Sequence, residues 1–366
     1  MKYFHTLIKP ASSICNMRCK YCFYDDVSSN RETKNYGRMN NDNAKILIDK
    51  VLNMFNEDVT ITFAFQGGEP TCAGLNYFKL FVSYVKEVKR DYHIINYAIQ
   101  TNGYSLEEKW YKFFEENNFL VGISIDGFKA IHDKYRLNIN GKGTFDSIIN
   151  TMNNFKNHKI EFNVLTVLNS TVAKYPKELF NFYKDYNIRY VQLIPCLPNL
   201  DEVNNKLSLT PQMFYKFYNE FFRLWYKEFK RGNYISVTLF DNLIPMFIGK
   251  RPSQCGYLGQ CNNQCVVEGN GDVFPCDFYV LDKYKTGNII KDDINDILNS
   301  KVGIDFINEK RKYSKKCPAC KYQRICYGQC KRLSVCYYDE NYCGYQHFIE
   351  SNIDGIMDVC KSIRRY

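Results

Sequence analysis

Three cysteines close together near the start of the chain could hold a metal cluster. Cys15, Cys19 and Cys22 lie on a loop after the apolar run 4–8, at spacings of four and three residues. Three thiolates can ligate three irons of a four-iron cluster and leave the fourth iron open for a substrate or cofactor. Structural zinc is the alternative, but such a site closes with a fourth Cys or His, and the next His along the chain is His93. The spacing therefore favours an iron–sulfur cluster.

Eleven further cysteines lie in the last third of the chain, and a single zinc ribbon would need only four of them. They are Cys255, Cys261, Cys265, Cys276, Cys317, Cys320, Cys326, Cys330, Cys336, Cys343 and Cys360. Clustered cysteines in an intracellular chain of this size are more often metal ligands than disulfide partners. We expect a cytoplasmic protein, because its start lacks the features of a signal peptide and no apolar run is long enough to span a bilayer.

Length and charge set outer bounds on the class of protein. A chain of 366 residues with 45% hydrophobic side chains can bury one large core and support a smaller second domain. The net charge is +10, yet Lys and Arg alternate with acids along most of the chain, so nucleic-acid binding is not expected. One dense basic patch, 310–312 with Lys315 and Lys316, stands before Cys317. It could offset cluster thiolates, attract an acidic partner or be a solvated face.

Strands and helices alternate from the first apolar run to about residue 194. Expected strands are 4–8, 59–65, 94–99, 119–125, 160–168 and 189–194, and expected helices are 43–55, 77–89, 106–116, 145–156 and 174–186. Six such units predict an α/β fold with a parallel sheet whose functional residues lie at the carboxyl ends of the strands. An aromatic helix over 214–229 should serve packing, and 250–253 reads as a linker.

Several strand ends carry polar and glycine-rich turns. Gly67-Gly68-Glu69-Pro70 would let the backbone approach a ligand closely and offers a carboxylate for an ammonium group. Stretches 100–103 and 124–127 end the next two strands, and Arg136 follows. Each stretch alone is ordinary turn chemistry. Their order behind the three cysteines is what makes the set informative.

The CxxxCxxC spacing with this ordered set resembles the radical S-adenosylmethionine (SAM) superfamily. The resemblance implies a partial (β/α)6 TIM-like barrel over about residues 1–235, with SAM bound to the open iron. It places Gly68 and Glu69 at the SAM ammonium, and Arg136 at the SAM carboxylate. Ser124 would contact the ribose or the carboxylate. Tyr21 and Leu197 would border the adenine, although Tyr21 could equally be a core aromatic and Leu197 rests on its position after the sixth strand.

The second cysteine group resembles the SPASM extension of radical SAM maturases, which would occupy 236–366 together with the linker. That resemblance implies two further four-iron clusters, three in all, with four thiolates on each auxiliary cluster. Cluster I would take Cys255, Cys261, Cys276 and Cys330, and cluster II would take Cys317, Cys320, Cys326 and Cys343. Such closed clusters move electrons or organise the fold. Cys265 could replace Cys261 and Cys336 could replace Cys343, whereas Cys72, Cys196 and Cys360 look like ordinary buried thiols.

Within that group the chain is most similar to the anaerobic sulfatase-maturating enzymes, through segments 8–13, 22–24, 63–71 and 275–282. The resemblance implies oxidation of a Cys or Ser side chain to formylglycine on an unfolded or nascent sulfatase polypeptide. A low-potential donor such as ferredoxin or flavodoxin would supply electrons. A base must also remove the thiol or hydroxyl proton. Asp277 is the candidate, with an ordinary turn Asp beside Cys276 as the alternative.

Two other classes remain open. A SPASM-type maturase of ribosomal peptides would share the clusters but form thioether or carbon–carbon links. It often carries a winged-helix domain ahead of the barrel, and the barrel is expected to start at Phe4 here. A non-enzymatic iron–sulfur or zinc regulator would lack the SAM-contact set and would not cleave SAM.

Overall fold

The computed structural model describes residues 2–201 and 205–363. Packing divides the chain into two compact units. The first unit comprises 1–124, 135–162 and 262–309, and the second comprises 125–134, 163–261 and 310–366. Each unit contains residues of both the barrel and the extension, so the two units reflect packing and do not coincide with the two predicted domains. The functional boundary at residue 235 stays a prediction.

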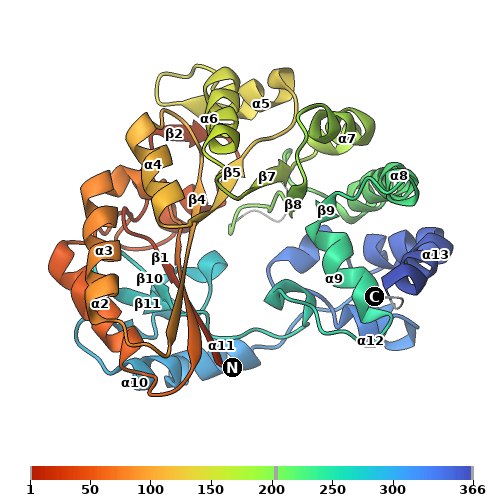
Figure 1. Cartoon of the computed structure of the whole chain (residues 1–366). Helices are drawn as coiled ribbons and strands as arrows, with labels where there is room; N and C mark the ends of the chain where they lie inside the picture. The colour runs from red at the N-terminus through yellow and green to blue at the C-terminus, as the bar shows by residue number, and fades with distance from the viewer. Residues whose placement is uncertain (1, 202–204, 364–366) are drawn as a thin grey trace. The chain divides into compact units, whose positions relative to one another are not determined.

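Parallel strands form the centre of the first unit (Figure 1). Strands β1 (Lys2–Ile8), β3 (Val59–Phe65), β4 (His93–Thr101) and β5 (Leu120–Ser124) pair in that order, all parallel. Between them run helices α2 (Asn41–Leu52), α3 (Leu75–Val88) and α4 (Glu108–Glu116), followed by α6 (Phe145–Asn157). Each expected strand and helix of this stretch is confirmed. Aromatic side chains fill the interface, with the Phe65 ring 5.1 Å from Phe81 and 4.9 Å from Phe78.

Residues from far along the chain extend this sheet beyond β1. Strand β10 (Val266–Val267) pairs parallel with β1, and β11 (Asp272–Phe274) and β12 (Gly287–Asn288) follow as antiparallel neighbours. A separate two-stranded sheet joins β2 (Met17–Cys19) to β6 (Arg136–Asn138). The remaining helices of the first unit are α1 (Phe23–Ser29), α10 (Ile294–Leu298) and α11 (Lys301–Asn308).

The second unit has its own parallel strands, β7 (Phe162–Leu168), β8 (Tyr190–Pro195) and β9 (Ser236–Val237), in that order. Its helices are α7 (Pro176–Asp185), α8 (Pro211–Lys230), α9 (Thr238–Met246), α12 (Gln323–Cys326) and α13 (Gly344–Ile363), and α5 (Lys129–Tyr135) begins in it. The aromatic helix α8 packs against α13, which confirms its packing role. A Cβ on Gly344 would lie 2.0 Å from the Pro211 carbonyl oxygen, so only glycine lets these helix starts touch.

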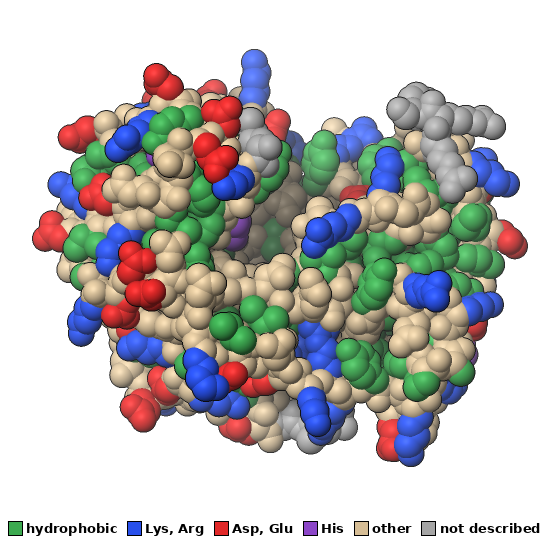
Figure 2. All heavy atoms as spheres, turned by 90° about the horizontal axis from the view of Figure 1, so that it is seen from below, with side chains coloured by type: hydrophobic (Ala, Val, Ile, Leu, Met, Phe, Trp, Pro, Cys, Tyr) green, Lys and Arg blue, Asp and Glu red, His purple; other side chains and the backbone are tan. Residues whose placement is uncertain are grey.

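Charge of both signs is mixed on one face of the protein. Figure 2 shows Lys and Arg side chains interspersed with Asp and Glu side chains on the face that it presents. Across residues 2–201 and 205–363, no helix combines the length and the apolar character needed to cross a bilayer.

Candidate active site

The three N-terminal cysteines lie together on one short loop of the first unit. Cys15 precedes β2, Cys19 ends β2 and Cys22 caps the start of α1. Burial raises the pKa of the Cys15 thiol to about 12, and Glu69, Cys19 and Cys22 add to the rise. Burial also raises the pKa of the Cys22 thiol. Thiols in this state become thiolates when a metal displaces their protons.

The donor set suits a multi-iron cluster, because Cys15, Cys19 and Cys22 lie close enough to influence one another. Within the described part of the chain, no three Cys, His, Asp or Glu side chains converge so as to hold one metal ion. A four-iron cluster places each thiolate on a separate iron, so its ligands need not converge on one point. Three mutually close thiols on a loop meet that requirement.

The glycine-rich turn after β3 lies directly against the cysteine loop. The Gly68 N–H donates to the Ser12 carbonyl at 2.8 Å, and the Glu69 N–H donates to the Ile14 carbonyl at 2.8 Å. A Cβ on Gly68 would lie 2.3 Å from the Ile14 carbonyl oxygen. The close backbone approach expected here is therefore made to the cysteine loop itself. The contact of Gly68 with SAM stays a prediction.

Glu69 is buried and ties the turn to the end of β4. Its Oε1 accepts from the Thr71 N–H, from the Thr71 hydroxyl and from the Thr101 hydroxyl, and its Oε2 accepts from the Asn102 N–H at 2.7 Å. Burial raises the pKa of this carboxyl, and the hydrogen bonds oppose the rise. Because Oε2 accepts a single bond, it keeps a lone pair for an ammonium group. Asn102 also reaches the Cys15 sulfur at 3.7 Å.

Arg136 lies opposite Cys19 in the small sheet. The register of β2 and β6 pairs the two residues, and Arg136 Nη1 is 4.0 Å from Cys19 Sγ. The guanidinium carbon of Arg136 is 5.6 Å from the centre of the Tyr21 ring, within cation–π range. The first unit thus brings together Arg136, Tyr21 and the cysteine loop. A buried, permanent cation at this loop suits an anionic ligand group.

Ser124 and Leu197 were the other predicted SAM contacts. Ser124 is half-buried at the end of β5, where its Oγ accepts from Gln100 Nε2 at 3.1 Å. Leu197 is half-buried just after β8 and belongs to the second unit. Their contacts with SAM stay predictions.

Asp277 lies at the carboxyl ends of two central strands. Its Oδ1 forms an ion pair with the Lys9 ammonium, and its Oδ2 accepts from Gln66 Nε2 at 2.9 Å. Lys9 follows β1 and Gln66 follows β3, immediately before the glycine-rich turn. Phe278, next along the chain, packs edge-on against Phe23 at 5.3 Å. The carboxylate is thereby fixed beside the loop that carries the three cysteines.

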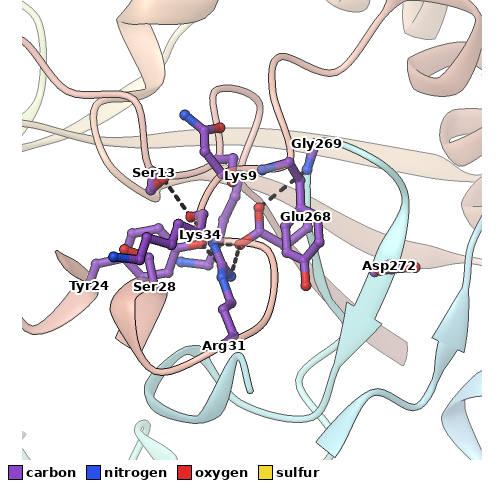
Figure 3. Close-up of polar contacts among 12 residues, drawn as sticks. Lys9, Ser13, Tyr24, Ser28, Arg31, Lys34, Glu268, Gly269 and Asp272 are labelled. Carbon is purple, nitrogen blue, oxygen red and sulfur yellow. Dashed lines mark hydrogen bonds and ion pairs between the residues drawn. The ribbon is translucent and has the colours of Figure 1, made fainter. Parts of the chain in front are cut away.

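Sequence reasoning gave no role to Lys9, which is completely buried. The available signal was a lysine directly after a buried strand, at its carboxyl end. The Lys9 ammonium lies 3.9 Å from the centre of the Tyr24 ring, and the Tyr24 hydroxyl donates to Glu268. Figure 3 shows these side chains with Arg31, which pairs with Glu268 at 2.9 Å. Burial raises the pKa of Tyr24, so its hydroxyl keeps the proton that it donates.

Four cysteines of the second unit line one cavity. Cys317, Cys320, Cys326 and Cys343 border a space of about 680 Å³. Burial raises the pKa of the Cys326 thiol to about 12, and the Cys343 and Cys317 thiols add to the rise. This set is the one predicted for auxiliary cluster II, and the cavity accommodates a group held by four thiolates. Cys336 is buried elsewhere, with its Sγ 3.6 Å from the Cys196 carbonyl oxygen.

The predicted ligands of auxiliary cluster I divide between the units. Cys255, Cys261 and Cys330 belong to the second unit and Cys276 to the first. Burial raises the pKa of the Cys330 thiol, and Cys261 adds to that rise. Arg311 donates to Cys261 Sγ at 3.4 Å. Cys265, the possible substitute, is buried and accepts from the Thr6 hydroxyl at 3.7 Å.

Comparison with known proteins gives two family matches. The family model described as the radical SAM superfamily matches residues 10–183, and the model described as an iron–sulfur cluster-binding domain (SPASM) matches residues 255–321. A cysteine-type anaerobic sulfatase-maturating enzyme of Clostridium novyi is 40% identical over 99% of both chains. A serine-type enzyme of Bacteroides thetaiotaomicron is 30% identical over 90% of this chain and 83% of its own.

A solved structure gives the same result at the level of the fold. The structure described as native anSMEcpe with bound AdoMet, which is SAM, and the Cp18Cys peptide matches with a TM-score of 0.91 and 36% identity. The match covers 99% of each chain. The predicted partial barrel with a cysteine-rich extension is confirmed by these matches.

Proposed function

We propose that this chain, which belongs to the anaerobic sulfatase-maturating enzymes of the radical SAM superfamily, converts a cysteine of a sulfatase polypeptide to formylglycine. The chain is a radical SAM enzyme with a SPASM extension, and its cofactors are SAM and [4Fe-4S] clusters. Cysteine is preferred as the target because the cysteine-type relative is the more similar of the two types.

The cofactors and the chain divide the work. When bound and reduced, the cluster on Cys15, Cys19 and Cys22 supplies the electron that cleaves SAM to a 5′-deoxyadenosyl radical. Arg136 and Glu69 orient SAM through its carboxylate and its ammonium. Bound in this way, SAM would supply the radical that takes hydrogen from the substrate Cβ, so the chain has to hold that Cβ near the 5′ carbon of SAM.

Asp277 receives the thiol proton of the substrate. Lys9 occupies one side of its Oδ1, and Gln66 holds its Oδ2, so the plane of the carboxylate is fixed. Each carboxylate oxygen has a second lone pair, which leaves room for one more proton. General bases are effective when they are held within hydrogen-bond reach of the proton that they remove.

The observation that carries the proposal is the position of Asp277. Asp277, a residue of the extension, contacts Lys9 directly after β1 and Gln66 directly after β3. The cysteine loop follows the end of β1, and the glycine-rich turn follows the end of β3. An ordinary turn Asp would need neither a buried lysine nor a glutamine from two strand ends. The 40% identity over nearly the whole chain favours sulfatase maturation over peptide crosslinking.

Mass spectrometry after anaerobic incubation tests the function. The cluster-loaded enzyme is given SAM, dithionite and one of two short sulfatase peptides that differ only in Cys or Ser at the target. We expect the mass change for replacing the side chain by an aldehyde, with the Cys peptide converted faster. Intramolecular crosslinks without aldehyde would instead identify a peptide maturase.

The Asp277→Asn variant tests the base. Asn keeps the shape and cannot accept the proton, so we expect full iron, SAM binding and 5′-deoxyadenosine formation with little formylglycine. The comparison uses the same peptide at matched iron content and scores the two products separately. A near-normal aldehyde yield would exclude the base role, and loss of iron with activity would favour a structural role beside Cys276.

The setting of the reaction follows from its chemistry. The substrate is an unfolded or nascent sulfatase polypeptide, because the target side chain has to enter the site. A low-potential carrier such as ferredoxin or flavodoxin delivers the first electron. We place the enzyme in the cytoplasm, where low-potential carriers and newly made polypeptides are found together.

A further inference from the structure

The segment 310–338 carries only positive charge. It contains nine Lys or Arg residues and no Asp or Glu, in a chain where the two signs otherwise alternate. The nine are Lys310, Arg311, Lys312, Lys315, Lys316, Lys321, Arg324, Lys331 and Arg332. Such a concentration creates a positive local potential that attracts acidic partners.

Part of this charge is already used within the second unit. Lys315 pairs with Glu340, and Lys321 pairs with Glu350 at 3.8 Å. Arg311 donates to the Gln329 carbonyl as well as to Cys261, and Arg332 donates to the Pro198 carbonyl at 2.6 Å. These four basic residues therefore stabilise the local structure of the second unit.

Four others have no such use. Lys310, Lys312, Lys316 and Arg324 are exposed, and among the residues that the structure describes none of the four has an ion-pair partner. Lys316 and Arg324 line the cavity that holds the four cysteines. Unpaired positive charge beside this cavity would attract a negatively charged partner to it.

The rim of the same cavity is aromatic. Tyr313 and Tyr327 line it and are 52% and 50% exposed. Exposed tyrosines beside positive charge form the mixed apolar and polar surface typical of protein interfaces. Cys317 and Cys320 are only half-buried, so the cavity lies close to solvent.

We propose that the surface formed by Lys310, Lys312, Lys316, Arg324 and the two tyrosines, the basic rim, docks an acidic one-electron redox protein. The proposal rests on the proposed function, which releases one electron per turnover. After hydrogen abstraction the Cβ radical loses one electron while the S–H proton passes to Asp277, and the C=S bond forms. The docked carrier, in its oxidised form, takes up that electron and is reduced by one electron.

Charge reversal at the basic rim tests the proposal. The variant combines Lys312→Glu, Lys316→Glu and Arg324→Glu, and its matched control combines Lys216→Glu, Arg223→Glu and Lys227→Glu on exposed positions of α8. Both change the net charge equally. Binding of an acidic flavodoxin to the cluster-loaded enzyme is measured anaerobically at low and high salt. Formylglycine formation is then followed with flavodoxin and, separately, with dithionite.

We expect the rim variant to slow association with flavodoxin by roughly ten- to a thousandfold at low salt, the range over which charge steers protein association. High salt should remove most of the difference from wild type. The control should bind as wild type does. Iron content should be unchanged in both. The dithionite-driven reaction should also be unchanged, since without a protein carrier the released electron can return to the first cluster for the next SAM cleavage, and this return needs no docking surface.

Flavodoxin binding equal to that of the control would overturn the proposal. So would a rim variant whose dithionite-driven reaction requires a higher concentration of full-length sulfatase, because the basic rim would then bind the substrate. If the charge-reversal variant has a lowered iron content, the test is repeated with a variant that combines Lys312→Gln, Lys316→Gln and Arg324→Gln. We expect this variant to lose less flavodoxin binding than the charge-reversal variant. Absence of aldehyde from wild type with dithionite would count against the proposed function, while the binding measurement would still decide the docking surface.

Discussion

At the scale of single residues, the feature that demands explanation is the amount of charge buried behind Asp277. Lys9, Arg31 and Glu268 have no exposed side-chain surface, although burial of a charge costs free energy unless the charge is paired. Here each has a partner. Lys9 pairs with Asp277 and Arg31 with Glu268. The Tyr24 ring lies against Lys9, and the Tyr24 hydroxyl donates to Glu268. The network holds the end of β1 to the segment 268–277.

Removing Arg31 should therefore destabilise the protein strongly. Arg31→Met leaves the Glu268 carboxylate buried without its cation, and breaking a buried pair in this way costs about 3–5 kcal/mol. Thermal unfolding of the cluster-loaded protein under anaerobic conditions measures the loss. The double variant with Glu268→Gln should recover part of it. Lys301→Met, which breaks an exposed pair with Asp305, should have little effect, and an equally small effect for Arg31→Met would contradict the argument.

Gly68 gives a second prediction, this one about cofactor loading. Gly68→Ala would force a methyl group to within 2.3 Å of the Ile14 carbonyl oxygen, so the cysteine loop has to move. Wild type should hold about 12 irons for three four-iron clusters, and the variant about 8. Iron analysis and SAM binding after anaerobic reconstitution measure this. Gly141→Ala has a positive φ of its own but open space around it, and it should keep all its iron.

The residues of the proposed site differ in how far the sequence reveals them. Cys15, Cys19 and Cys22 follow from spacing, because cluster ligation by a short loop needs that spacing. Lys9 and Gln66 do not, since a lysine and a glutamine at strand ends acquire a role only when Asp277, more than 200 residues later in the chain, packs against them. Contacts across that separation leave no local pattern.

At the scale of elements, periodicity predicts the strands and helices of the first unit well and predicts its extension poorly. Strand β3 occupies 59–65 as expected, because seven consecutive apolar or β-branched residues are buried on both faces. Strands β10 and β12 have two residues each, too short for any period to be read. Strand β10 forms on the edge of β1, which offers unpaired backbone groups that another segment can bond, and β12 pairs in turn with β11.

The stability contributed by the contacts between α4 and the end of α6 should depend on pH. His158, just after α6, contacts Glu115 at 2.8 Å and Glu108 at 3.3 Å on α4. The hydrogen bond to Glu115 raises the pKa of His158 above 6.5, and Glu108 adds to the rise. Because the pKa of His158 is higher in the folded protein than in the unfolded chain, its contacts stabilise the fold fully at pH values below the pKa of the unfolded chain. That stabilisation is lost as the pH rises through the pKa of the folded protein.

His158→Gln should therefore lower the unfolding temperature more at pH 6 than at pH 8.5. The effect is modest, because exposed ion pairs contribute less than about 1 kcal/mol. Unfolding of the cluster-loaded protein is compared with wild type at both pH values. Glu115→Gln removes the main partner and should show the same pH dependence. If the loss in unfolding temperature instead grew with rising pH, the raised pKa of His158 could not be its cause, and the prediction would be wrong.

At the scale of the whole molecule, residues 262–309 of the extension pack as part of the first unit and continue the sheet of β1. That arrangement explains how Asp277 comes to contact Lys9 and Gln66, which lie more than 200 residues earlier in the chain. It also explains why a domain boundary drawn from the sequence does not coincide with a division by packing. The extension contributes to the proposed site directly and not only through its clusters.

Cluster-selective variants separate the roles of the two ends of the chain. Replacing Cys15, Cys19 and Cys22 by Ala should remove about 4 of about 12 irons and abolish SAM cleavage, because the open iron is lost. Replacing Cys317, Cys320, Cys326 and Cys343 by Ala should remove a similar amount of iron and leave SAM binding at the first site. It should lower formylglycine relative to 5′-deoxyadenosine, since the last electron has lost its exit.

The control for both is a variant with Cys72, Cys196 and Cys360 replaced by Ala, which should keep its iron because these thiols are assigned to no cluster. Iron, 5′-deoxyadenosine and aldehyde are measured on the same preparations with dithionite. SAM cleavage by the variant without Cys15, Cys19 and Cys22 would refute the open-iron assignment. Unchanged coupling between the two products in the second variant would show that the electron leaves by another route, and the basic rim would then need another explanation.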